Sequence, residues 1–188
     1  MSARAEVRAL GPREDTAWLG MIIFLASWAM MFASLVFAGA MVRSRLPTWP
    51  PPGMPALPRL LPAFNTLVLG ASSLCLQRAL AAARLGQPWQ RGVVATIALG
   101  LCFVVLQVFC WAGLVESGLR WPDGALAGIV SGFTGFHALH VVVGLFGLAV
   151  VVSRGVAARL ISLRLWTMYW HFVGVVWLAL CLVAFTSW

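Results

Sequence analysis

Five long stretches of this 188-residue chain are almost free of charged side chains. A helix needs about 20 predominantly apolar residues to cross a hydrocarbon core about 30 Å thick, and each stretch is at least that long. Only the second contains charge, at Arg78 and Arg84, near its end, where a guanidinium group can reach the membrane surface. The sequence therefore predicts an all-α membrane protein, a bundle of five transmembrane helices. The predicted spans are residues 17–42, 62–84, 92–115, 124–153 and 165–188.

The composition excludes a water-soluble fold. The chain is 62% apolar and 10% charged, with a mean hydropathy of +0.94, whereas soluble domains carry about 25% charged residues. We expect a cytoplasmic N-terminal tail at residues 1–16 and a single transmembrane domain at residues 17–188. The one long loop, residues 43–61, contains six prolines, so we expect it to run extended over the outer surface.

The basic residues predict the orientation. All 13 are arginine, and nine of them fall on the N-terminal side of the membrane against four on the other side. Because positive charge is retained in the cytoplasm, we expect the N-terminus in the cytoplasm and the C-terminus outside. The net charge of +8 does not indicate nucleic-acid binding, since the arginines flank the spans and form no dense basic face. Anionic lipid headgroups are the expected counter-charges.

Three histidines lie inside predicted spans. His137 and His140 share one side of the fourth span, and His171 lies early in the fifth. Histidine at membrane depth usually faces protein, a proton path or a cofactor. With cytoplasmic helix ends near residues 153 and 165, the helical rise places His140 roughly 20 Å deep and His171 roughly 9 Å deep. Two haem ligands need similar depths, so we expect a structural role, with a stand-alone haem-binding membrane anchor as the alternative.

The sequence indicates little other chemistry. All five acidic residues lie in the tail, at a helix end or in a loop, whereas proton-coupled transporters usually need a buried acid. The four cysteines lack paired metal-site spacing. The amides Asn65 and Gln107 should find partners on other helices, and the spacing of Gly128 and Gly132 permits a close helix contact. We therefore expect no catalytic residue and no metal ligand in this chain.

Two motifs on the fourth and fifth predicted helices are similar to those of a known family. Gly135-Phe-His-Ala-Leu-His-Val resembles the segment Gly-Phe-His-Gly-x-His-Val, and Tyr169-Trp-His-Phe-Val with Val176-Trp177 resembles Tyr-Trp-His-Phe-Val-Asp-Val-Val-Trp. In their order and separation they resemble subunit III of the haem-copper respiratory oxidases, in particular cytochrome c oxidase. Five helices are typical of the short bacterial form, so the resemblance implies a multi-pass protein of the bacterial cytoplasmic (inner) membrane.

This resemblance implies a non-catalytic subunit of a proton-translocating haem-copper terminal oxidase in aerobic respiration. Such a subunit stabilises subunit I, binds phospholipid and supports proton uptake. It carries no cofactor of its own, because haem and copper reside in the partner subunits. The implied partners are chiefly subunit I, then subunit II, small subunits and a reductase in a supercomplex. The alternative within the resemblance is an accessory subunit of a quinol oxidase or a nitric oxide reductase.

The family pattern also implies which side chains organise the bundle or a lipid groove. These structural or lipid-groove candidates are His137, His140, Tyr169, Trp170, His171, Asn65 and Gln107. Three membrane acids of the family are replaced here, two glutamates by Trp28 and Cys110 and one aspartate by Gly174. A role of those acids in proton delivery cannot be transferred to this chain. We hypothesise that Trp28 fills a groove where the family seats lipid.

Overall fold

The computed structural model describes residues 12–48, 60–118, 125–153 and 159–185. These residues form five α-helices, and each is long and apolar enough to cross a membrane. The prediction of an all-α bundle of five transmembrane helices is confirmed. The helices are α1 (Pro12–Ser44), α2 (Leu60–Arg84), α3 (Gln90–Glu116), α4 (Ala125–Ser153) and α5 (Arg159–Phe185).

Four of the five helices, all but α4, begin before their predicted apolar spans. α1 begins at Pro12, and α5 begins at Arg159 rather than near Leu165. Charged residues limit the part of a helix that spans the membrane, but they do not end the helix. Proline is favoured in the first turn of a helix, which suits the start of α1 at Pro12. Residues 1–11 of the predicted tail and residues 49–59 of the proline-rich loop lie outside the described part of the chain.

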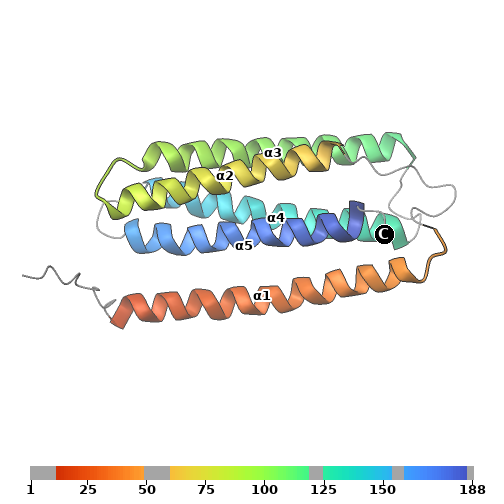
Figure 1. Cartoon of the computed structure of the whole chain (residues 1–188), viewed down its shortest axis with the longest axis horizontal. Coiled ribbons are helices and arrows are strands. Elements are labelled where there is room, and N and C mark those ends of the chain that lie inside the picture. Colours follow the sequence, from red (N-terminus) through yellow and green to blue (C-terminus); the bar gives the residue numbers. More distant parts are fainter. Residues whose placement is uncertain (1–11, 49–59, 119–124, 154–158, 186–188) are drawn as a thin grey trace, which may run out of the picture.

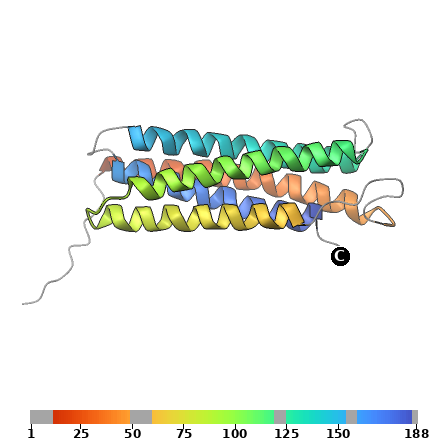
Figure 2. The same ribbon diagram turned by 90° about the horizontal axis from the view of Figure 1, so that it is seen from above.

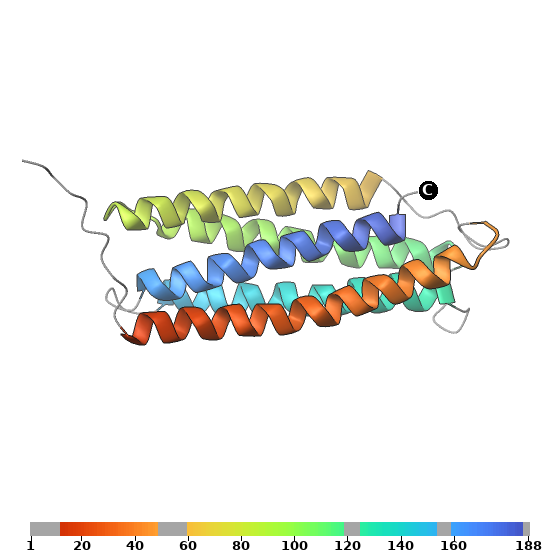
Figure 3. The same cartoon turned by 60° about the horizontal axis from the view of Figure 1, so that its bottom comes forward.

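The five helices run roughly along one axis, and consecutive helices are antiparallel (Figures 1 and 2). α2, α3, α4 and α5 form a four-helix group in which each helix contacts its neighbours, and α4 and α5 lie together between α1 and the α2/α3 pair (Figure 1). α1 contacts only α5 and α4 among the described helices (Figure 3). Its first residue and the last described residue of α5 lie at opposite ends of the bundle (Figure 1).

The core of the four-helix group is built around Trp170 of α5, which is fully buried. Two glycines let neighbouring helices approach its ring. A Cβ built on Gly100 would lie 2.7 Å from Trp170 Cη2, and one built on Gly144 would lie 2.9 Å from Trp170 Cε3. A Cβ on Gly147 would likewise overlap the ring of Trp166. Small residues facing large aromatic ones therefore set the spacing of α3, α4 and α5.

The close contact expected at Gly128 and Gly132 is wrong for the described part of the chain. A Cβ at either position would meet no atom within 4 Å among the described residues. Both glycines are exposed, whereas Gly144 and Gly147, farther along α4, face the tryptophans of α5. The close approach of α4 therefore lies at the second glycine pair.

Candidate functional site

The candidate residues of the sequence fall in three separate places. Asn65, Gln107, His137 and Trp170 lie in the interior of the four-helix group and are 2% exposed or less. A second set, including His140 and Tyr169, lies where α1 meets α4 and α5. His171 lies in a groove between α2 and α5. The structure thus brings these residues together in groups and not into one site.

The interior group is held by hydrogen bonds that cross between helices. Asn65 Nδ2 on α2 donates to Gln107 Oε1 on α3 at 3.4 Å and to the carbonyl oxygen of Phe103 at 3.3 Å. Trp170 Nε1 donates to Ser72 Oγ at 3.0 Å, which joins α5 to α2. Such bonds are worth about 1 kcal/mol each inside a membrane bundle. They fix the rotation of α2, α3 and α5 about their own axes.

His137 lies among aromatic rings in the same interior. Its side chain is 1% exposed. Its ring centroid is 5.9 Å from that of Phe103 and 5.2 Å from that of Trp177. The indole N–H of Trp177 donates to Thr66 Oγ1 at 2.9 Å. Among the described residues, neither ring nitrogen of His137 has a hydrogen-bond partner.

An aromatic cluster joins α1 to α4 and α5. Trp28 and His140 are at its centre, with ring centroids 4.0 Å apart and planes at 72°. The Nδ1 of His140 lies 2.7 Å from the carbonyl oxygen of Phe136, so this nitrogen donates to it. The Tyr169 hydroxyl donates to the carbonyl oxygen of His140 at 3.0 Å. The members of the aromatic cluster are Phe24, Trp28, Phe32, Phe136, His140 and Tyr169.

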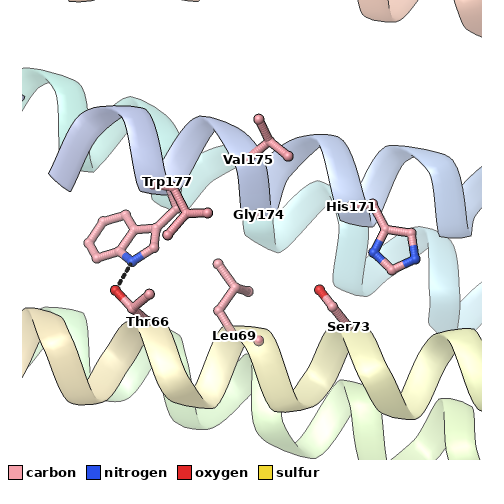
Figure 4. Close-up of a pocket in the computed structure, with 9 residues that line it drawn as sticks. Thr66, Leu69, Ser73, His171, Gly174, Val175 and Trp177 are labelled. Atoms are coloured by element: carbon pink, nitrogen blue, oxygen red, sulfur yellow. Dashed lines mark hydrogen bonds between the residues drawn. The ribbon is translucent and has the colours of Figure 1, made fainter. Parts of the chain in front are cut away.

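The α2/α5 groove has a different character from the buried groups. It has a volume of about 260 Å³ and a largely apolar lining. Thr66 and Trp177 lie toward one end, and Ser73 and His171 toward the other (Figure 4). His171 Nε2 donates to Gln77 Oε1 at 3.1 Å. Gly174 lies in this groove, and a Cβ at that position would be 3.7 Å from Ser73 Oγ.

The geometry separates His140 from His171. His140 faces the rings of α1, and His171 bonds to Gln77 of α2. α1 and α2 have no pair of Cα atoms within 8 Å among the described residues. The two imidazoles therefore face different sides of the bundle and are not arranged as a pair of ligands for one haem.

The family model described as "Cytochrome c oxidase subunit III" matches residues 13–188, almost the whole chain. The chain belongs to the cytochrome c oxidase subunit III family. The membership predicted from the two histidine motifs is confirmed.

Alignments with named subunit III proteins cover most of this chain. The "Cytochrome c oxidase subunit 3" of Synechocystis sp. is 33% identical over 179 residues, which cover 91% of this chain and 76% of the relative. The "Probable cytochrome c oxidase subunit 3" of Mycobacterium bovis is 34% identical over 182 residues, covering 92% and 89%. The subunit 3 of Danio rerio is 36% identical over 176 residues, covering 86% and 66%.

Sequence reasoning named three of the six members of the aromatic cluster, Trp28, His140 and Tyr169, but did not predict that they lie together. Phe24, Trp28 and Phe32 recur every four residues, so they share one side of the first helix. Phe136 and His140 repeat the same spacing on the fourth. The signal is hidden because every face of these helices is apolar. Gln77, the partner of His171, carries no comparable signal, since it is one polar residue near the end of a span.

Replacing Trp28 by alanine should loosen α1. The change removes a ring that contacts His140, Phe32 and Phe136, and such aromatic pairs are worth about 1 kcal/mol. We expect a loss of about 1 kcal/mol in the free energy of unfolding, measured by circular dichroism in denaturing detergent. Trp18→Ala on the same helix is the control, because Trp18 is exposed. Equal losses in the two variants would contradict the assignment.

Proposed function

We propose that this chain is the non-catalytic subunit III of a proton-translocating haem-copper terminal oxidase, cytochrome c oxidase, in a bacterial cytoplasmic membrane. The match of residues 13–188 to the subunit III family carries this conclusion. In that role the chain stabilises subunit I, binds phospholipid and supports proton uptake. The proposed partners are subunit I, then subunit II and small subunits, with a reductase in a supercomplex.

Several features support a role without chemistry of its own. His140 donates to the backbone of its own helix, and His171 is bonded to Gln77. Within the described ranges, no three His, Cys, Asp or Glu side chains gather where they could hold a metal ion. The positions of the three family acids hold Trp28, Cys110 and Gly174. Haem and copper then belong to the partner subunits, and this chain acts by packing.

The other functions are less well supported. The named relatives are cytochrome c oxidase subunits, which favours that enzyme over a quinol oxidase or a nitric oxide reductase. A stand-alone haem anchor would need two imidazoles that face each other, whereas His140 and His171 face different sides of the bundle.

Removing this chain from the oxidase tests the proposal. The complex from cells that lack the chain should keep its haem spectrum and its initial rate of oxygen consumption. It should lose activity faster during turnover, because subunit I has lost the helices packed against it. The complex rebuilt with the full chain is the control. Loss of the haem spectrum together with the chain would show that the chain holds a redox centre, which contradicts the proposal.

We assign phospholipid binding to the α2/α5 groove. Its lining is mostly apolar, as an acyl chain requires, and Ser73, Thr66 and His171 add hydrogen-bonding groups (Figure 4). Gly174 keeps the groove open, because it places no side chain there. The separate hypothesis that Trp28 fills a lipid groove concerns the side of α4 and α5 that faces α1. There the Trp28 ring lies against His140.

Gly174→Leu should reduce the phospholipid that the purified subunit retains. The leucine side chain would extend into the groove beside Ser73 and displace an acyl chain. Phosphorus content after extensive detergent washing is the measurement. Gly132→Leu is the matched control, because Gly132 is exposed and lies outside the groove. An unchanged phosphorus content in Gly174→Leu would show that lipid is not held there.

A further inference from the structure

Three buried polar atoms lack hydrogen-bond partners among the described residues: both ring nitrogens of His137 and the Oδ1 of Asn65. Both side chains are only 1% exposed. A neutral imidazole has one N–H donor and one acceptor nitrogen. Leaving such groups unpaired away from water costs free energy, and at membrane depth lipid offers no replacement partner. A small bound molecule that both donates and accepts hydrogen bonds would satisfy these three atoms.

The two aromatic neighbours of His137 do not supply those bonds. Phe103 and Trp177 present aromatic rings to it. The N–H of Trp177 already donates to Thr66 Oγ1. The Phe103 ring, at 75° to the imidazole, offers at most a weak acceptor for the imidazole N–H. The acceptor nitrogen of His137 would still be unpaired.

Asn65 and His137 are linked through Phe103 and through Trp177. Asn65 Nδ2 donates to the carbonyl oxygen of Phe103, whose ring lies beside His137. Thr66, the residue after Asn65, accepts the N–H of Trp177, whose ring also lies beside His137. Asn65 on α2 and His137 on α4 thus both lie next to Phe103 of α3 in the interior of the four-helix group, Asn65 at its carbonyl oxygen and His137 at its ring.

We propose that water binds at this point and bridges Asn65 Oδ1 to the imidazole of His137. Water is small and both donates and accepts, and buried waters typically make about three hydrogen bonds to otherwise unpaired groups. The bridge joins two helices whose backbones lie apart, since α2 and α4 have no pair of Cα atoms within 8 Å in the described ranges. It gives the bundle a diagonal link through its centre.

Solid-state NMR of the full chain in phospholipid vesicles, with ¹⁵N-labelled histidine, tests the bridge. The chain has three histidines, so spectra of His140→Phe and His171→Phe assign the His137 signals. We expect magnetisation transfer from water protons to a His137 nitrogen, and at least about half of it should be lost in Asn65→Leu, since a water needs several polar partners to stay bound. Absence of transfer in the natural chain would overturn the proposal. Transfer that Asn65→Leu leaves unchanged would overturn the bridge.

A double-mutant cycle gives an independent readout. His137→Phe should lower the folded-to-unfolded ratio about tenfold, because it displaces the water and leaves Asn65 Oδ1 unpaired. Asn65→Leu should lower it further, because it also removes the donor to Gln107 Oε1 and to the carbonyl oxygen of Phe103. The double variant should lose about as much as Asn65→Leu alone, and not the product of the two losses, since neither polar group of the bridge is then left unpaired. A ratio raised by His137→Phe would mean that the histidine is dry and unpaired, and it would overturn the bridge.

Discussion

Trp170→Ala is expected to destabilise the bundle more than any other change considered, by about 3 kcal/mol in the free energy of unfolding. Trp170 is fully buried and its ring contacts glycines of two neighbouring helices, Gly100 and Gly144. Its N–H also donates to Ser72 on a third helix. Alanine would leave a cavity between α3, α4 and α5, and it would remove the hydrogen bond to α2. Inside a membrane the loss is mainly one of packing contacts, because lipid is as apolar as the core.

Unfolding in denaturing detergent, followed by circular dichroism, measures this loss. Trp18→Ala is the matched control, because it removes the same side chain from an exposed position on α1. We expect Trp18→Ala to change the free energy of unfolding by less than about 0.5 kcal/mol. Trp170→Phe separates the two effects, since it keeps most of the ring volume and loses the bond to Ser72 Oγ. A Trp170→Ala variant as stable as the natural chain would contradict the central place of this side chain.

Gly144→Val should cost about 2 kcal/mol by overpacking. A Cβ at this position would lie 2.9 Å from the ring of Trp170 and 3.1 Å from that of Tyr169. Both rings are buried and hydrogen-bonded, so neither can move aside without losing a bond. α4 would have to shift away from α5, which also disturbs the contact of Tyr169 with the backbone of His140.

Gly132→Val is the control for this variant. It makes the same substitution in the same helix, where a Cβ would meet no atom within 4 Å in the described ranges. Both variants therefore carry the same change in helix propensity. Only Gly144→Val should lower the free energy of unfolding well beyond that shared effect. Equal stability of the two variants would mean that α4 and α5 are not closely packed at Gly144.

The number and type of the helices could be predicted from the sequence because charge and length limit what can cross a membrane. The helix ends could not, since α1 begins at Pro12 and α5 at Arg159, and both helices include charged residues outside the apolar spans. The sequence also did not show which face of each helix packs against its neighbours. A soluble helix marks its buried face with apolar residues, whereas these helices are apolar all round. In these helices the size of the side chains decides which face packs closely. From the sequence, the pair Gly128 and Gly132 was therefore as suitable for a close contact as Gly144.

The candidate residues could be found by motif but not arranged in space. His137 and His140 are three residues apart, and the structure places one in the interior and the other in the aromatic cluster. A single helix gives the direction of each side chain but not the identity of the neighbouring helix. The partners Gln77 and Phe103 come from helices distant in sequence. The orientation of the bundle in the membrane rests on the arginine distribution and stays a prediction.

Purification of the tagged chain from its native membranes in a mild detergent tests the proposed function most directly. The visible spectrum of the purified material and its oxygen uptake with reduced cytochrome c are the two readouts. The account predicts a haem-bearing complex of several subunits that consumes oxygen. A chain that carries haem without any partner, or a complex active on nitric oxide and inert toward oxygen, would contradict it.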